Sequence, residues 1–261
     1  MKIIVCVKQV PDTTEVRINQ ETGTLIRDGV PSIMNPDDKA AMELALRMKD
    51  EKPEICVHVL TMGPKQAEGV LIEALCMGAD QATLLSDRKF AGADTWATST
   101  ALAGAIKEIG ADIVLCGRQA IDGDTAQVGP QIAEHLNLAQ ATYVSHAVLG
   151  GEGVLATRKF EDGDYKLELP LPCLLTTLSE EIEVRYMHTH HIVTTMKDRK
   201  IHMMTADDLK VDQRELGLKG SPTRVKKSVT KSAKSAGTRY IENPEVGLEK
   251  IVDYVKGLNI L

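Results

Sequence analysis

Short apolar runs alternate along the first half of the chain with longer segments whose apolar residues recur at helical spacing. The runs have the length and composition of buried parallel strands; they are Lys2–Val7, Glu54–Leu60, Gln81–Ser86 and Asp112–Gly117. The intervening segments predict helices, over residues 34–51, 63–80 and 94–110. Strands that alternate with helices predict an α/β fold, a doubly wound and mostly parallel sheet with helices on both faces.

The pattern changes after residue 136. The stretch Gly153–Leu169 alternates as an antiparallel hairpin does, with a turn near Asp162 and Gly163. Another buried strand is predicted over Pro172–Leu178. The hairpin is therefore an excursion, after which the chain returns to the parallel sheet.

A third change, near Lys210, predicts a domain boundary. Residues 1–209 form the expected α/β domain, and residues 210–261 an extended C-terminal arm. The segment Lys219–Tyr240 is basic and poor in core residues, and an Asn-Pro start predicts a last amphipathic helix over Asn243–Leu258. Such an arm either folds back on its own domain or docks on a partner subunit.

Composition narrows the classes of function. Aromatic residues make up only 3% of the chain and the net charge is −6, so neither stacking platforms nor a basic surface is available for nucleic acid. The five cysteines are scattered without a Cys-x-x-Cys pair, which is typical of reduced thiols in a cytoplasmic protein. We expect no signal peptide, because a strand follows Met1 almost at once, and no apolar run reaches membrane-spanning length.

Three loops should meet at the carboxyl edge of the sheet, where open α/β folds bind their ligands. They are CVKQVPDT after the first strand, TMGP after the second, and GRQAIDGDTAQVGP after the fourth. Pro130 fits only the first turn of a helix, so the helix should start between Thr125 and Gly129. Its free N–H groups could bind phosphate, and Lys8 or Arg118 could supply a cation.

A capped helix with nothing bound is the alternative interpretation of this loop. Neither GxxxxGK[ST] nor GxGxxG occurs in the chain, which disfavours a P-loop enzyme and an ordinary dinucleotide-binding fold. No nucleophile and base are placed as a hydrolase requires. A stand-alone ATP-binding enzyme and a structural AMP-holding subunit stay open as further alternatives.

At this point the motifs are recognisable. The chain resembles the β subunits of electron-transfer flavoproteins over nearly its whole length. The resemblance rests on CVKQVPDT, MNPDDKAAMELALRMKDE, GRQAIDGDTAQVGPQIAEHL and EVRYMH, in that order. It implies an adenine-nucleotide-binding α/β fold and a heterodimer with an α subunit that carries FAD. It also implies that the β subunit holds AMP or a second FAD.

The family's cofactor site carries over to the positions that match its motifs. The residues so implied are Cys6, Asn35, Pro36, Asp37, Asp38, Met62, Ala120, Ile121, Asp122, Gly123, Asp124, Thr125, Ala126, Gln127, Val128, Gly129, Pro130 and Gln131. N–H groups and Thr125 would hold phosphate, and the strand ends with Met62 would hold adenine. Asp122 and Asp124 suit a loop-capping or ribose-binding role, and Gly129 is expected to permit close approach to the phosphate.

The loop sequence DGDTAQVGP is similar to that of the electron-bifurcating members, and VPDT at Val10–Thr13 points the same way. This resemblance implies FAD rather than AMP in the β subunit and NADH as the electron donor. Ferredoxin would be one acceptor, and an acyl-CoA dehydrogenase or reductase the other.

The segment after residue 184 matches the family's dehydrogenase-docking segment at Arg185 and Tyr186. The leucine that anchors the dehydrogenase in the best-known form has no counterpart here. His188, His190 and His191 stand in its place, and we assign them to the docking segment. Because His-x-His-His lacks a companion ligand at usual spacing, a solvated loop is favoured over a metal site.

Overall fold

A computed structural model describes residues 1–12, 17–18, 25–26, 31–151, 153–199, 201–224 and 244–257. Thr13 and most of the basic segment Lys219–Tyr240 lie outside these residues. Contacts divide the chain into two units, Met1–Arg224 and Val225–Leu261, and each is described by itself.

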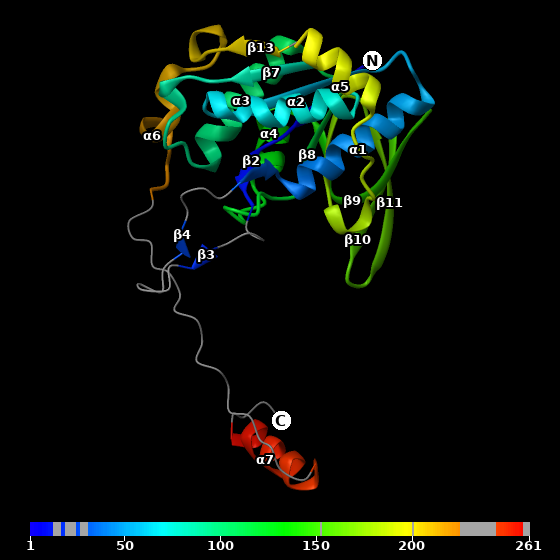
Figure 1. Ribbon diagram of the computed structural model, residues 1–261, viewed down its shortest axis with the longest axis vertical. Helices are drawn as coiled ribbons and strands as arrows, with labels where there is room; N and C mark the ends of the chain where they lie inside the picture. Colours follow the sequence, from blue (N-terminus) through cyan, green and yellow to red (C-terminus); the bar gives the residue numbers. More distant parts are fainter. Residues whose placement is uncertain are drawn as a thin grey trace. The chain divides into compact units, whose positions relative to one another are not determined.

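A sheet of nine strands forms the centre of the first unit, as far as the described residues go (Figure 1). The strand order is β11-β10-β9-β12-β8-β1-β6-β7-β13. The strands are β1 (Lys2–Cys6), β6 (Cys56–Met62), β7 (Gln81–Leu85), β8 (Ile113–Gly117), β9 (Ala139–Gly150), β10 (Gly153–Phe160), β11 (Gly163–Pro170), β12 (Cys173–Thr177) and β13 (Ile201–Met204). All neighbouring pairs are parallel except β9 with β10 and β10 with β11.

Helices and short elements complete the described residues. The α-helices are α1 (Pro36–Glu51), α2 (Glu68–Met77), α3 (Thr95–Ile109), α4 (Val128–Leu136), α5 (Thr189–Lys197), α6 (Gly217–Gly220) and α7 (Pro244–Gly257). Two antiparallel pairs join β2 (Gln9–Pro11) to β5 (Ser32–Met34) and β3 (Arg17–Ile18) to β4 (Leu25–Ile26). The 3₁₀ turns are η2 (Lys65–Ala67), η3 (Arg88–Phe90), η4 (Ser179–Glu181), η5 (Ala206–Asp208) and η6 (Gln213–Glu215).

The sheet is covered on both faces. Alternate residues of β1 point to opposite sides, so Ile3 and Val5 pack with α1 and α2, whereas Ile4 and Cys6 pack with α3 and α4. Two aliphatic cores result, one on each face. The doubly wound, mostly parallel fold predicted from the sequence is confirmed.

The predicted hairpin is present as β10 and β11, and Phe160 pairs with Gly163 at its turn. Strand β9, which precedes it, was not predicted. Its buried residues Ala141, Val144 and Ala147 are three apart, because the pairing with β12 shifts register near Tyr143. Tyr143 has a φ of 59°. The irregularity hides the two-residue period by which a strand is recognised.

Two further elements differ from the sequence interpretation. The three histidines lie at the start of helix α5 rather than in a solvated loop, because His188 caps the helix by accepting the His190 N–H at 3.2 Å. Helix α5 packs against α2, and the chain then adds β13 beside β7 at the edge of the sheet.

The first contact unit ends at Arg224, beyond the boundary expected at residue 210. Leu216 is buried, and the Leu218 N–H donates to the Ala91 carbonyl at 3.0 Å. These contacts hold residues 210–224 on the α/β domain.

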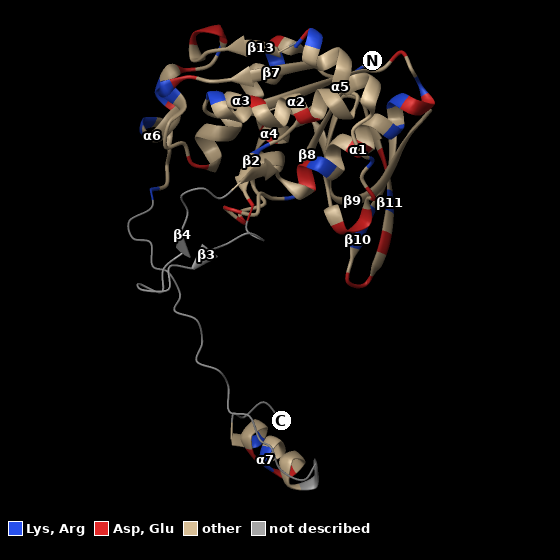
Figure 2. Ribbon diagram, viewed as in Figure 1, with Lys and Arg blue, Asp and Glu red and all other residues tan. Residues whose placement is uncertain are grey.

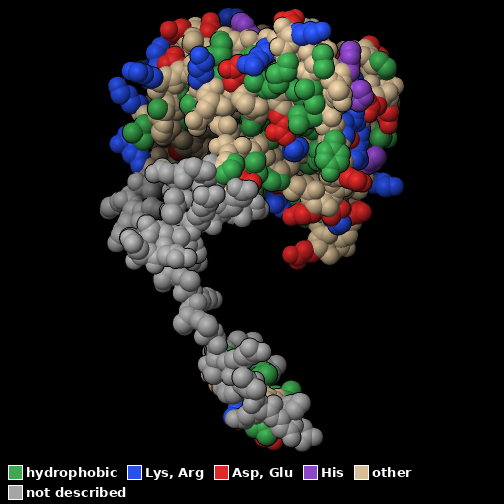
Figure 3. Space-filling view, in the orientation of Figure 1, with side chains coloured by type: hydrophobic (Ala, Val, Ile, Leu, Met, Phe, Trp, Pro, Cys, Tyr) green, Lys and Arg blue, Asp and Glu red, His purple; other side chains and the backbone are tan. Residues whose placement is uncertain are grey.

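Helix α7 belongs to the second unit. Leu248, Ile251 and Val252 share one face of this helix and are exposed. Figure 3 shows hydrophobic side chains on the surface of α7. None of the described helices is both long and apolar enough to cross a membrane.

His58 makes the stability of the fold sensitive to acid. It is buried on β6, with Nε2 2.8 Å from Thr83 Oγ1. Burial lowers the pKa of His58 to about 4, and the nearby charges of Lys2 and His202 act in the same direction, whereas a hydrogen bond to Gln81 raises it.

Between pH 6.5 and about 4 the unfolded chain therefore binds a proton at this position that the folded chain does not. We expect the melting temperature of the wild type to fall relative to that of His58→Gln as the pH drops through this window. Calorimetry of both proteins from pH 7.5 to 4 tests this, and parallel curves would contradict it.

Candidate functional site

The candidate site lies at the carboxyl ends of β1 and β8, where the winding of the sheet reverses. From β1 the chain builds β6 and β7 on one side, then returns through α3 to place β8 on the other side. Such a switch point leaves a crevice, because the loops after the two strands diverge to opposite faces. The loop after β1 and the loop after β8 are two of the three that the sequence placed at this edge.

The start of α1 links these loops. Asn35 is completely buried and precedes Pro36 at the start of the helix. Its Nδ2 donates to the Gln119 carbonyl at 2.8 Å, and its Oδ1 accepts the Ile121 N–H at 3.1 Å. Its backbone N–H donates to the Lys8 carbonyl at 2.9 Å. One residue therefore fixes the loop after β8 against the loop after β1.

Asp38 repeats this link with its carboxylate. One oxygen accepts the Lys8 N–H at 2.8 Å and the other accepts the Gly117 N–H at 2.9 Å. Burial raises the pKa of Asp38 to about 7 and outweighs these hydrogen bonds, which lower it.

Asp37 extends the link to β12. Its Oδ1 accepts the Ser179 N–H at 3.0 Å, and its Oδ2 lies 3.3 Å from Arg118 Nε. Thr177, at the end of β12, donates from Oγ1 to the Asp37 carbonyl at 2.9 Å. Asn35, Asp37 and Asp38 thus hold together the loops after three adjacent strands.

The loop after β8 is acidic and exposed over residues 122–125 (Figure 2). Asp122 forms an ion pair with Lys8, with Nζ 2.7 Å from Oδ1, and Asp124 accepts from Gln119 Nε2 at 3.1 Å. Asp124 and Ala126 have φ values of 48° and 52°, which non-glycine residues adopt only at a cost. Both acids therefore have partners at this edge, and their loop-capping or ribose-binding role stays a prediction.

Helix α4 begins at Val128, within the predicted range. Gln127 precedes it, and no side chain caps the helix. The first N–H groups of a helix have no partner within it and carry the positive end of its dipole. Gln131 Oε1 is buried without a hydrogen-bond partner among the described residues. This helix start can bind an anion, and Gln131 can still accept a hydrogen bond.

Gly129 has a packing role, and the role expected for it beside a phosphate stays a prediction. It is buried, and a Cβ at this position would lie 2.7 Å from Thr176 Cγ2 on β12. The close packing of α4 on the sheet therefore requires glycine here. Gly123, in contrast, has open space where its side chain would be.

The two remaining residues of the predicted set lie at strand ends. Met62 ends β6 and is half-buried. Cys6 ends β1 and is paired in register with Cys116 of β8. The hydrogen bond that the Cys116 thiol shares with Cys6, together with burial, raises the pKa of Cys116, so this thiol stays protonated at neutral pH. The site gathers all the predicted residues at one edge; their role in binding a cofactor stays a prediction.

Comparison with known proteins identifies the family. A family model described as the electron transfer flavoprotein domain matches residues 22–208. The electron transfer flavoprotein subunit beta of Clostridium acetobutylicum is 55% identical over 94% of this chain and 93% of its own length. The chain belongs to the electron transfer flavoprotein family.

Two other relatives within the electron transfer flavoprotein family cover almost the whole chain. The subunit beta of Thermoanaerobacterium thermosaccharolyticum is 50% identical over 100% of both chains. The caffeyl-CoA reductase-Etf complex subunit CarD of Acetobacterium woodii is 50% identical over 91% of this chain and 90% of its own length.

The predicted docking residues of this flavoprotein chain lie elsewhere, along α1 and at α5. Arg185 bonds to the buried Glu43, with Nε 2.8 Å from Oε2, and its Nη2 lies 2.6 Å from Asp50 Oδ2. Arg185 therefore anchors the segment to α1. Tyr186 is 97% exposed and can contact a partner. Among the described residues no His, Cys, Asp and Glu side chains gather in a group suited to a metal ion.

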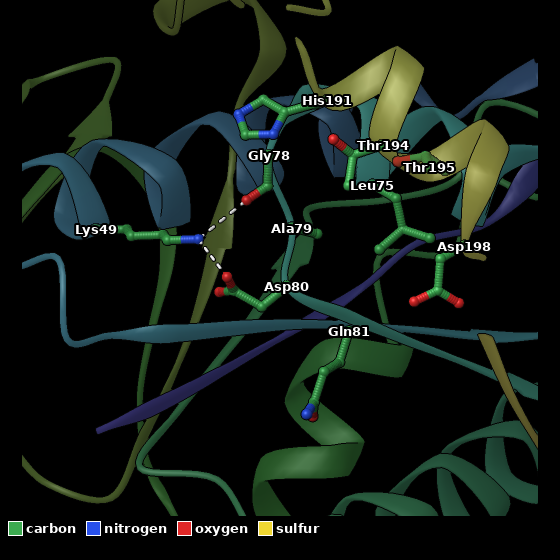
Figure 4. Close-up of a pocket in the computed structure, with 10 residues that line it drawn as sticks. All are labelled: Lys49, Leu75, Gly78, Ala79, Asp80, Gln81, His191, Thr194, Thr195 and Asp198. Carbon is green, nitrogen blue, oxygen red and sulfur yellow. Dashed lines mark hydrogen bonds and ion pairs between the residues drawn. The ribbon is translucent and has the colours of Figure 1, made fainter. Parts of the chain in front are cut away.

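A shallow cavity of about 300 Å³ lies beneath α5 (Figure 4). His191, Lys49 and Asp80 are among its lining residues, and Lys49 Nζ bonds to Asp80 Oδ1 at 2.6 Å. Gln81, another lining residue, begins β7, so the cavity lies at the amino edge of the sheet. It is distinct from the candidate site at the carboxyl edge.

The sequence interpretation missed the contribution of β12. Thr177 and Ser179 bond to Asp37, yet nothing in their sequence distinguishes them from other residues that follow a strand. The strand order would have identified them, because β12 lies beside β8.

Asp38 gives the site a pH dependence. Between pH 4 and about 7 the folded protein retains a proton on Asp38 that the unfolded chain has lost, so this group's contribution to stability decreases as the pH rises. We expect the melting temperature of the wild type to fall relative to that of Asp38→Asn over this range. Thermal unfolding of both proteins at half-unit steps provides the test. A constant difference would refute the role of Asp38.

Gly129→Ala should destabilise the protein by about 1–3 kcal/mol, because the added methyl group overlaps Thr176. The double variant Gly129→Ala/Thr176→Ser removes the opposing methyl group and should recover most of the loss. Denaturant unfolding of the wild type, the two single variants Gly129→Ala and Thr176→Ser, and the double variant measures both effects. Gly123→Ala is the matched control and should change stability little, since its side chain enters open space. Failure of the rescue would argue against packing as the cause.

Proposed function

We propose that this chain is the β subunit of an electron-bifurcating electron transfer flavoprotein. In this proposal it holds FAD, receives electrons from NADH, and delivers them to ferredoxin and, through the FAD of an α subunit, to an acyl-CoA dehydrogenase or reductase. The observation that carries the proposal is the convergence of the Ala120–Gln131 loop, the uncapped start of α4 and Lys8 at the switch point of the sheet.

The residues present fit an adenine dinucleotide. The start of α4 offers N–H groups and a positive dipole for a diphosphate, with Thr125 beside it in the loop. Two cations lie at this edge, and both have acidic partners: Lys8 is paired with Asp122, and Arg118 Nε lies 3.3 Å from Asp37 Oδ2 without a hydrogen-bond partner among the described residues. Asn35 and Asp38 keep the two loops at a fixed spacing. When bound, FAD would supply the exchange between two-electron and one-electron transfer that the polypeptide lacks.

The acids of the loop do not oppose this assignment. Asp122 is paired with Lys8 and Asp124 with Gln119, so the chain itself balances much of their negative field. Gly123 faces open space and leaves room beside the helix start. The loop DGDTAQVGP, through its resemblance to the bifurcating members, supports FAD over AMP.

Two surfaces suit the proposed partners. Helix α7 exposes Leu248, Ile251 and Val252 on one face, which an α subunit could cover. The segment around α5 exposes Tyr186 and Met196, and we assign it to the acyl-CoA dehydrogenase or reductase. The name of the Acetobacterium woodii relative, which refers to a caffeyl-CoA reductase complex, supports a reductase as the partner.

A cofactor count with paired loop variants tests the proposal. The wild-type heterodimer should release two FAD and no AMP on denaturation. Thr125→Asp places a carboxylate in the exposed loop beside α4, so it should weaken binding of one FAD about tenfold or more. Thr125→Asn is its neutral isostere and should keep both cofactors.

Quantitative chromatography of the released nucleotides, with binding titrations of FAD, gives the result. One FAD and one AMP in the wild type would replace the bifurcating proposal with a simple one-electron carrier. If Thr125→Asp and Thr125→Asn bound FAD with equal affinity, the proposal that the FAD phosphates bind at the start of α4 would be refuted.

A further inference from the structure

The last described residues of the first unit are tied to the start of α3. Thr223 donates to Asp94 Oδ2 from its backbone N–H at 2.9 Å and from Oγ1 at 2.7 Å. Ser221 Oγ accepts the Asp94 N–H at 2.9 Å and donates to the Gly217 carbonyl at 2.8 Å. Helix α6, which leads into this segment, lies against α3 (Figure 1). The C-terminal arm therefore begins from a fixed point, Asp94.

Asp94 serves two segments with one carboxylate. Its Oδ1 caps α3 by accepting the Ala97 N–H at 3.0 Å, while Oδ2 receives Thr223. Burial alone would raise the pKa of Asp94, but the hydrogen bonds from Thr223 and Ala97 bring it below its ordinary value. The carboxylate is thus charged at neutral pH and can hold both segments at once.

The next residue reaches the candidate site. Thr95 Oγ1 donates to Gln127 Oε1 at 3.1 Å, and Gln127 is the residue immediately before α4. Trp96, also in the first turn of α3, places its ring 4.7 Å from that of His135 in the last turn of α4, and His135 Nε2 lies 3.1 Å from Ser99 Oγ. The first turn of α3 therefore contacts α4 at both ends, and the Thr95–Gln127 bond joins the two helix starts.

We propose that Asp94 and Thr95 are positioning residues that couple the root of the C-terminal arm to the nucleotide-binding loop. Docking of the arm on the α subunit then favours the loop geometry that binds nucleotide, and bound nucleotide favours the docked arm. This inference rests on the proposed function, which supplies both the nucleotide and the partner. By linkage the two effects must be equal in size.

The experiment measures the affinity of the full-length chain for its α subunit with and without saturating FAD, and, in a separate series, AMP. In the wild type we expect nucleotide to strengthen the complex about tenfold. Thr223→Val removes the hydroxyl bond at an exposed position and should reduce the enhancement to about twofold or less. Its affinity for nucleotide in the absence of the α subunit should be unchanged, since Thr223 does not line the site.

Two further variants separate coupling from a structural effect. Thr95→Val breaks the link to Gln127, and the double variant Thr95→Val/Thr223→Val should lose no more coupling than either single change, because both lie on one path. Thr205→Val is the matched control. Thr205 makes the same backbone and hydroxyl bonds to Asp208, at 2.7 and 2.8 Å, and should keep the full enhancement.

The outcomes are distinguishable. An enhancement that persists in Thr223→Val, or losses that add in the double variant, would overturn the coupling and leave the proposed function intact. A wild-type chain that binds the α subunit and nucleotide with no mutual effect would also overturn it. If the wild type bound neither FAD nor AMP, both the proposed function and this inference would fail.

Discussion

The arrangement of the candidate site depends on the hydrogen bonds made by Asn35, Asp37 and Asp38 at the start of α1. Their side chains bond to the loops that follow β1, β8 and β12, which are adjacent strands in the sheet. Without them, the backbone groups at the ends of these strands would need water or other partners, because the ladder of the sheet ends there. The site is thus built from a helix start, and the loops take their spacing from it.

Placing two carboxylates in such a site is costly unless they find partners. Asp37 and Asp38 lie in the first turn of α1, where the dipole favours negative charge. Asp37 also has Arg118, and Asp38 has two backbone N–H groups. Burial still raises the pKa of Asp38 to about 7. Near neutral pH, the charged and the protonated forms of Asp38 are therefore similar in free energy in the folded protein.

The segment after β12 connects the candidate site to the surface around α5 by lying along α1. Ser179 bonds to Asp37 in the first turn of that helix, and Arg185 bonds to Glu43 and Asp50 farther along it. The His188 N–H then donates to the Cys76 carbonyl near the end of α2. A single helix therefore orders both the carboxyl edge of the sheet, where the candidate site lies, and the approach to the proposed docking surface.

The sequence by itself determined the alternation of strands and helices, the first turn of α1, the start of α4 and the loop that joins β8 to it. These features depend on local chemistry: apolar period, Pro in a first helical turn, and acids at a helix start. Motif order also indicated the family. The register shift in β9 could not be predicted from the sequence, because it depends on pairing with β12, which is distant in the chain. The capping of α5 by His188 could not be predicted either, because histidine is not a consensus helix cap.

Only the tertiary structure decided which residues act together. The packing role of Gly129 is one example, since Thr176 of β12 leaves no room for a side chain there. Strand order and helix packing bring three further residues to the site or its surroundings, namely Thr177, Ser179 and Asp94. Hydrogen bonds that join residues a hundred or more positions apart leave no periodic trace in the chain. Their partners are therefore fixed by the fold alone.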